Sequence, residues 1–227
     1  MSRMPLAERR RQLTEAAIRA MTRDGVPRTT TRSIAAEAGV SLSVFHYCFD
    51  SKQALLESVI TAITDHYVGT VKKALRPRAT FRETMRAGFE AYWEHVLAHP
   101  GEHMLTYELT QHALRTPGFE PLARRQHERY AEIYQELIEE LDASMMLDIL
   151  VPVPVLARYL ASVTDGLTLN ILVLGHDEES AALLDLVTDQ VAALVRDGSG
   201  APEASTDRRR RSGREDGRPL EPGDQGA

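Results

Sequence analysis

Three histidines recur at four-residue spacing in the middle of the chain, and this spacing could serve a metal ion. They are His95, His99 and His103, and Glu102 lies beside the last of them. Two histidines four residues apart on one helix can ligate zinc. Pro100, however, breaks a helix between the second histidine and the third. We therefore favour exposed or hydrogen-bonded histidines, and we predict neither a metal site nor a cofactor.

Signatures of catalysis are missing from the sequence. It shows no nucleophile paired with a base in a known motif, no glycine-rich phosphate loop and no motif of paired carboxylates. We predict that the protein is not an enzyme. Cys48 is the single cysteine, which excludes an internal disulfide framework and fits a reducing compartment. We interpret it as a packing residue rather than a redox switch, because no Lys or Arg adjoins it in the sequence.

Residues 42–47 carry side chains suited to another kind of chemistry, contact with nucleic acid. Leu42, Ser43, Val44, His46 and Tyr47 are expected to face outward from one helix. A solvated helix face normally carries Lys, Glu and Gln, whereas this one carries small residues, a His and a Tyr. Such a face can approach a DNA groove and its phosphates closely. The alternative is a helical hairpin inside an ordinary core.

Two short helices and a tight turn must position this face. Thr30 can cap the first helix, and Gly39 can end it because glycine tolerates the left-handed conformation. Ser41 can cap the second helix. Phe45 and Phe49, four residues apart, would form the buried side of that second helix.

This segment, with the helix before it, resembles the N-terminal domain of the TetR family of bacterial transcriptional regulators. The matching residues keep the family's order and spacing without a gap: Gly25, Thr29, Thr30, Ile34, Ala35, Ala38, Gly39, Val40, Ser41, Tyr47, Phe49, Ser51, Lys52 and Leu55. The sequence departs from the pattern at His46, where the family usually has Tyr, and also at Cys48 and Asp50. These departures bear on the operator sequence rather than on the fold.

The resemblance implies a set of DNA contacts. In the family, positions matching His46 and Tyr47 commonly touch phosphates or bases, and Lys52 matches a lysine that contacts the DNA backbone. The full set of DNA-binding residues that we predict is Thr30, Thr31, Arg32, Ser41, Ser43, His46, Tyr47 and Lys52. The formal net charge of −6 fits this assignment, because residues 1–50 carry +3, residues 51–196 carry −8 and residues 197–227 carry −1. The basic excess thus lies where attraction to phosphates needs it.

Helical patterns fill the chain as far as residue 196, and no alternating strand pattern is present. We expect an all-α fold of about nine helices, with longer helices at about 6–23, 50–75, 80–98, 100–115, 119–141, 155–174 and 177–196. Asp50 and Gln53 would form the capping box of helix 50–75, which links the two domains mechanically. The predicted domains are a helix-turn-helix domain at 1–50, with its motif at 30–49, and a ligand-binding and dimerisation domain at 51–197. Residues 198–227, rich in Gly and Pro, are predicted to be a disordered tail.

Aromatic side chains gather in the middle of the chain beside a few polar ones. A cavity with few polar anchors is typical of small-molecule sites, and the resemblance implies five or six helices around a ligand cavity. The predicted ligand-binding residues are Phe89, Tyr92, Trp93, Tyr107, Glu108, His112, Tyr134 and Asp165. Two acids without a nearby Lys favour a neutral or cationic ligand. The alternative is a solid core without a cavity.

The last two helices are apolar on more than one side, which favours pairing with a second copy as a four-helix bundle. The predicted interface residues are Leu160, Val163, Leu167, Leu183, Val187, Val191 and Leu194. No apolar run has the length of a membrane span, and we expect a cytoplasmic protein without membrane contacts. The sequence therefore favours a homodimeric repressor that a small-molecule effector releases from palindromic operator DNA. The alternative is a helical protein that binds a small molecule or a metal and has a vestigial DNA head.

Overall fold

The computed structural model describes residues 4–197, which form nine helices and one two-strand ladder. This confirms the all-α fold class; the predicted tail at 198–227 lies outside the described residues. The elements are α1 (Leu6–Asp24), α2 (Thr31–Glu37), α3 (Leu42–Cys48), α4 (Lys52–Ala74), α5 (Phe81–Ala98), α6 (Pro100–Arg115), α7 (Glu120–Met145), β1 (Asp148–Ile149), α8 (Val153–Leu174), α9 (Glu178–Ala192) and β2 (Val195–Arg196). Among these residues, no helix combines the length and the apolar character that crossing a membrane requires.

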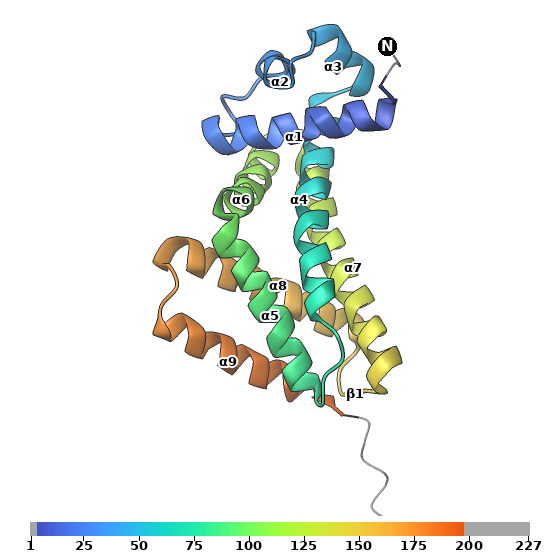
Figure 1. The fold of residues 1–227 in the computed structure, drawn as a ribbon, viewed down its shortest axis with the longest axis vertical. Helices are drawn as coiled ribbons and strands as arrows, with labels where there is room; N and C mark the ends of the chain where they lie inside the picture. The colour runs from blue at the N-terminus through green and yellow to red at the C-terminus, as the bar shows by residue number, and fades with distance from the viewer. Residues whose placement is uncertain (1–3, 198–227) are drawn as a thin grey trace, which may run out of the picture.

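The first three helices form one end of the molecule. Helix α1 lies across the ends of α4 and α6, and α2 and α3 lie on its far side (Figure 1). Their shared core contains Met21, Ile34 and Phe45, and it also includes Leu55 of α4 and Leu109 of α6. The core of this end thus continues past the predicted boundary at residue 50, because α4 and α6 pack directly against α1.

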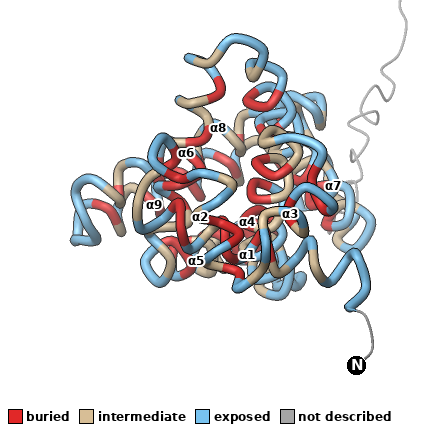
Figure 2. Tube along the Cα trace, turned by 90° about the horizontal axis from the view of Figure 1, so that it is seen from above, coloured by how far each residue is buried: buried red, intermediate tan, exposed pale blue. Residues whose placement is uncertain are grey.

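A second core lies between α5, α7, α8 and α9. Buried residues concentrate on the inward faces of the helices, while exposed residues follow their outer faces (Figure 2). Phe81, Phe89 and Trp93 of α5 pack there with Leu156 and Leu160 of α8. Burial of such side chains stabilises each by about 1.5–3 kcal/mol relative to exposure, so this core holds the second domain together.

The helix ends follow the predicted signals with two corrections. Ser41 occupies the N-terminal cap position of α3, but its side chain makes no capping hydrogen bond. Thr30 caps α2, since its hydroxyl accepts a backbone N–H three residues later, and Gly39 has a φ of 66° after that helix ends. The predicted Asp50 cap of α4 is wrong. Ser51 is the cap residue instead, and its Oγ accepts the N–H of Ala54 at 3.0 Å. Both residues have capping side chains, and α4 begins one residue later than expected.

The ladder between β1 and β2 was not predicted from the sequence. It pairs Asp148 with Arg196 and Ile149 with Val195 in antiparallel register, and two residues per strand offer no periodicity to detect. The Arg196 guanidinium also contacts the Asp148 carboxylate at 3.0 Å. The ladder ties the chain after α9 to the connection between α7 and α8.

Four of the predicted dimer contacts are wrong, because they belong to the core of their own subunit. Leu160, Leu167, Val187 and Val191 are each no more than 7% exposed. Three others, Val163, Leu183 and Leu194, are half-buried against the same core. The large apolar side chains that α8 and α9 leave exposed are Val155, Leu169, Val173, Leu174 and Leu186. The apolar stripe on each helix faces inward, and a separate outward row remains for a partner.

Candidate functional site

Helix α3 presents a polar face to solvent. Ser43, His46 and Tyr47 are exposed, and Tyr47 is 64% exposed. Phe45 and Cys48 point the other way and are buried, which agrees with the interpretation of the cysteine as a packing residue. The face is thus narrow and flanked by a rigid apolar side.

Two residues expected on this outward face lie elsewhere. Leu42 and Val44 are half-buried and pack against the first core. They lie on either side of exposed Ser43, whose Oγ is 2.8 Å from the Oγ of Ser41. The surface available for contact is therefore more polar than the sequence suggested.

The remaining predicted DNA contacts lie on α2 and at the start of α4. Thr30 and Arg32 are exposed, and Thr31, the first residue of α2, is half-buried. Lys52 is the first residue of α4. All eight predicted residues therefore lie on α2, on α3, just before those helices, or at the start of α4, at one end of the molecule (Figure 1). Contact with DNA itself stays a prediction.

Polar contacts also join α1 to α2. Arg19 and Arg23 donate to the Glu37 carboxylate at 3.2 and 3.0 Å, and the Arg23 hydrogen bond lowers the pKa of Glu37. The side-chain amide of Gln12 donates to the carbonyl of Ala38 at 2.9 Å. Because these exposed pairs are weak individually, the buried core sets the helix positions and the pairs set their orientation.

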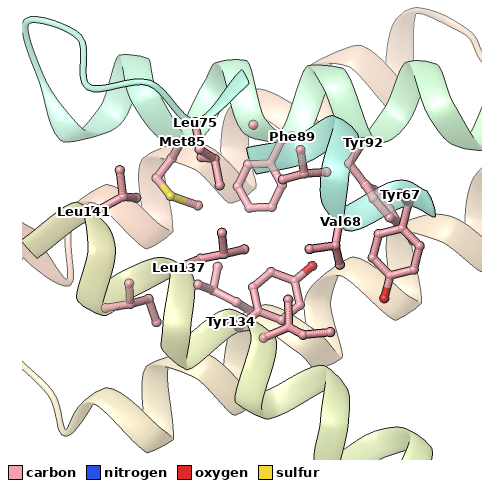
Figure 3. A pocket seen from close by; sticks show the side chains of 14 residues that line it. Tyr67, Val68, Leu75, Met85, Phe89, Tyr92, Tyr134, Leu137 and Leu141 are labelled. Carbon is pink, nitrogen blue, oxygen red and sulfur yellow. The ribbon is translucent and has the colours of Figure 1, made fainter. Parts of the chain in front are cut away.

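An apolar cavity of about 40 Å³ lies between α4, α5, α7 and α8. Side chains from α4 and α5 on one side and α7 on the other point toward a common space (Figure 3). The residues labelled there are Tyr67, Val68, Leu75, Met85, Phe89, Tyr92, Tyr134, Leu137 and Leu141. Phe89, Tyr92 and Tyr134 were predicted from the sequence as ligand-binding residues, and the structure brings them together.

A second, more polar cavity of about 30 Å³ adjoins the first. Tyr67, Tyr92 and Tyr134 line both cavities, and Tyr107 and Asp165 line the second. Asp165 is the only carboxylate among the residues that line either cavity, and neither lining includes a Lys or an Arg. Two further predicted residues, Tyr107 and Asp165, therefore lie at this second cavity.

Five tyrosines line the second cavity, three of them shared with the first, and we call them the tyrosine cluster: Tyr67, Tyr92, Tyr107, Tyr130 and Tyr134. The Tyr134 hydroxyl donates to Thr164 at 2.7 Å, and the Tyr107 hydroxyl donates to the carbonyl of Asp165 at 2.7 Å. Burial raises the pKa of each of the five, that of Tyr134 to about 12. The cluster therefore presents uncharged aromatic rings at neutral pH.

Three of the predicted ligand residues do not line either cavity. The indole N–H of Trp93 donates to His176 Nδ1 at 3.2 Å, inside the second core. Glu108 accepts the backbone N–H of Val26 at 2.9 Å, and the His112 ring packs against Phe119. The error arises because neighbours on a helix point about 100° apart, so only Tyr107 of this α6 group faces the cavities.

Tyr67 and Tyr130 were not among the predicted ligand-binding residues. Tyr67 lies on α4, the helix that the sequence indicates as a link between the two domains. Tyr130 belonged to the same aromatic group as the chosen residues. The concentration of aromatics was a usable signal, but only the packing of α4 against α5 and α7 shows which rings meet.

The Glu108 contact is part of the interface between α6 and the first three helices. Its carboxylate caps the turn after α1, where Gly25 has a φ of 82°. Nearby, Gly101 of α6 lies so close to α1 that an added Cβ would stand 2.6 Å from Thr22 Cγ2. Helix α6 therefore contacts the DNA-binding end closely at two places.

The histidines of α5 and α6 meet a fourth histidine. The prediction of exposed or hydrogen-bonded rings agrees with His99, whose Nδ1 lies 3.2 Å from the His95 carbonyl, and is wrong for His95 and His103. His66 of α4 lies with its Nδ1 3.1 Å from Glu102 Oε2. His95 and His103 are buried, and within the described chain the Nε2 of each has no hydrogen-bond partner. Burial lowers the pKa of both to about 4. His66 is remote in sequence, so local spacing could not reveal the group.

Comparison with known proteins agrees with this architecture. The family model described as bacterial regulatory proteins of the tetR family matches residues 13–59, and the model for the C-terminal part of BetI-type transcriptional repressors matches residues 77–196. The chain is 25% identical to the nicotine-responsive transcriptional repressor HdnoR of Paenarthrobacter nicotinovorans over 187 residues, 82% of this chain and 95% of that one. It is also 25% identical to the transcriptional regulator BetI of Burkholderia cenocepacia strain HI2424, over 82% of this chain and 94% of that one.

The fold is likewise shared with solved structures. A protein described as a TetR-family transcriptional regulator from Rhodococcus superposes with a TM-score of 0.70 at 18% identity, over 82% of this chain and 99% of that one. The BetI-type match alone covers more than half of the chain. The chain therefore belongs to the TetR family of bacterial transcriptional regulators, which are ligand-responsive DNA-binding proteins rather than enzymes.

Proposed function

We propose that this protein is a cytoplasmic, homodimeric repressor that an organic cation releases from a palindromic operator. The observation that carries the choice of effector is the tyrosine cluster, uncharged and adjacent to a single carboxylate. The alternative of a vestigial DNA head is not favoured, because α3 keeps an exposed polar face on a firmly packed support.

In this proposal each subunit inserts α3 into a major groove, and two half-sites lie about one helical turn apart, roughly 34 Å. Tyr47 and His46 contact phosphates and base edges from the exposed face. Lys52 contacts the backbone from the first turn of α4, where its charge joins the net +3 of residues 1–50. The acidic remainder of the chain limits non-specific association with nucleic acid.

The chemistry of the cavities favours a cation over an anion. Aromatic faces attract ammonium groups, each by about 0.5–2 kcal/mol depending on desolvation. Asp165 supplies the one carboxylate among the lining residues, and neither lining includes a Lys or an Arg. His103 also lines the second cavity, but burial lowers its pKa to about 4, so it adds no positive charge at neutral pH. The relative named as nicotine-responsive offers independent support, because nicotine is an organic base of modest size.

The size of the cavities implies that the ligand must open them. Volumes of about 40 and 30 Å³ hold little more than water molecules, so a drug-sized molecule needs the shared tyrosines to move. Tyr67 lies on α4 and Leu75 is the cap residue at its C-terminal end, while the first half of α4 packs in the core of the DNA-binding end. Opening the cavity would thus displace α4 and change the separation of the two DNA-binding heads in a dimer.

The test is a titration of operator affinity against a matched pair of probes. Fluorescence anisotropy on DNA from upstream of the protein's own gene would be measured with nicotine and choline, and with 3,3-dimethylbutan-1-ol, the uncharged isostere of choline. We expect at least one cation to weaken operator binding at concentrations where the isostere has no effect. Equal effects of choline and its isostere, together with no effect of nicotine, would exclude the cation effector, while absence of DNA binding would exclude the repressor.

A further inference from the structure

We propose that His66, His95 and Glu102 form a binding site for a divalent transition-metal ion such as Zn²⁺, separate from the effector site. The three residues come from α4, α5 and α6. A bound ion would therefore join three helices that meet below the DNA-binding end.

The geometry is close to that of a metal site. The candidate ligand atoms of the three residues all lie within 4.8 Å of one another, and His66 Nδ1 is already 3.1 Å from Glu102 Oε2. Ligand atoms held about 2.1 Å from a tetrahedral zinc ion stand roughly 3.4 Å apart. Rotation of the side chains by an ångström or so at their ends is enough to close the site.

The histidines lack the partners that would otherwise explain them. His95 is 5% exposed, and its Nε2 has no hydrogen-bond partner among the described residues. A buried polar nitrogen without a partner is unfavourable, and a metal ion would satisfy it.

Neighbouring rings enclose the site on the inner side. The His99 ring stacks on that of His95, with 4.4 Å between centroids, and lies 4.9 Å from that of His66. If His99 Nδ1 donates to the His95 carbonyl, 3.2 Å away, its Nε2 keeps a lone pair. His99 is thus available as a fourth ligand, and water could take this position instead.

The donor set selects the class of ion. Two imidazoles with one carboxylate suit Zn²⁺ and its borderline neighbours Co²⁺ and Ni²⁺, whereas Mg²⁺ and Ca²⁺ prefer oxygen ligands throughout. A surface cleft between α1, α4 and α6 reaches His66 and Glu102, so the ion has a path from solvent. Arginines of α1 line this cleft, and Arg11 and Arg19 are each paired with a glutamate.

Titration of tag-free full-length protein with Co²⁺ tests the proposal, because tetrahedral Co²⁺ has intense visible absorption bands. We expect bands that saturate at one Co²⁺ per chain, disappear on addition of Zn²⁺ and are absent when EDTA is present. Zn²⁺ should also raise the melting temperature, and EDTA should reverse this increase.

Variants at the two more accessible ligands make the test specific. His66→Ala and Glu102→Gln should each weaken metal binding at least tenfold, whereas His127→Ala, at an exposed histidine on α7, should leave it unchanged. His95→Gln would give a third comparison. Absence of saturable Co²⁺ bands in the folded protein, or binding that His66→Ala and Glu102→Gln leave intact, would overturn the site. Neither result bears on operator or effector binding, which are measured separately.

Discussion

At the residue scale, the exposed side chains of α3 and the first turn of α4 are the ones that we expect to read DNA. Tyr47→Ala and Lys52→Ala should each weaken operator binding by about tenfold or more, because each removes a contact to the phosphates or bases. For Lys52→Ala the dependence of log affinity on log salt should become shallower by about 1. Anisotropy titrations at several salt concentrations measure both quantities.

Lys73→Ala is the matched control for this prediction. Lys73 is exposed near the far end of the same helix, α4, and makes no contact with the DNA-binding end. Its removal should leave operator affinity close to that of the unchanged protein at moderate salt. If all three variants bind DNA alike, the assignment of the interface to α3 and the start of α4 is wrong.

The tyrosine cluster gives a second prediction, in which two variants distinguish the contribution of the aromatic ring from that of the hydroxyl group. Tyr134→Phe keeps the aromatic face and loses the hydrogen bond to Thr164. Tyr134→Leu loses the face as well, so it should weaken binding of a cation such as nicotine or choline by roughly tenfold relative to Phe. Calorimetry on the two variants measures the difference. Equal affinities in Phe and Leu variants would argue that the ring face takes no part.

Residue-level prediction from the sequence succeeded where a side chain's role depends on its immediate neighbours. The Thr30 cap, the glycine after α2 and the burial of Phe45 all follow from local spacing and were expected. Tyr107 and Glu108 show the limit. They were assigned to one site, but neighbouring residues on a helix point about 100° apart. Tyr107 therefore faces the cavities, whereas Glu108 contacts the turn after α1.

At the element scale, α8 and α9 are the helices that we expect to pair with a second subunit. Leu169→Glu combined with Leu186→Glu should give monomers, because both side chains are about half exposed and lie on the outward row. The monomer should also bind the two-half-site operator far more weakly. Sedimentation velocity measures the mass. Leu114→Glu, at an exposed leucine on α6, is the control and should stay dimeric.

The apolar character of these helices explains why their interface was predicted only in part. Helix α8 has apolar residues on several sides, so the sequence indicates an additional buried surface without saying which residues supply it. The apolar stripe that contains Leu160 and Leu167 is buried in the second core, where α8 packs against α7. Only after that face is assigned can the remaining row, with Leu169 and Val173, be identified.

The contact between α1 and α6 leads to a prediction about coupling. Glu108→Ala leaves the N–H of Val26 without its acceptor, which should lower the free energy of unfolding by about 1–3 kcal/mol. It should also weaken the effect of a bound effector on operator affinity. Glu108→Gln retains an acceptor oxygen and should behave nearly as the unchanged protein. Chemical denaturation and anisotropy measure the two effects, and a stable, fully inducible Ala variant would contradict them.

At the scale of the whole molecule, the boundary between the basic and the acidic part of the sequence does not coincide with the boundary between the two hydrophobic cores. The basic excess lies in residues 1–50. The sequence also suggested a domain boundary there, yet the first core extends to Leu105 and Leu122. The boundary in charge is therefore not a boundary in packing. Such an arrangement lets one surface attract DNA while its support responds to events in the second domain.

The small apolar cavity has a consequence for the volume of the protein. Voids lined by apolar side chains remain dry, and the apolar cavity amounts to about 40 Å³, or roughly 24 mL/mol, which unfolding would eliminate. Hydrostatic pressure should therefore unfold the unliganded protein more readily than the protein with a cation bound, and high-pressure tryptophan fluorescence of Trp93 would measure the two midpoints. Pressure destabilises the unliganded protein because unfolding removes its internal void and so decreases the volume. A bound effector should therefore lower the compressibility of the repressor as well as releasing it from DNA.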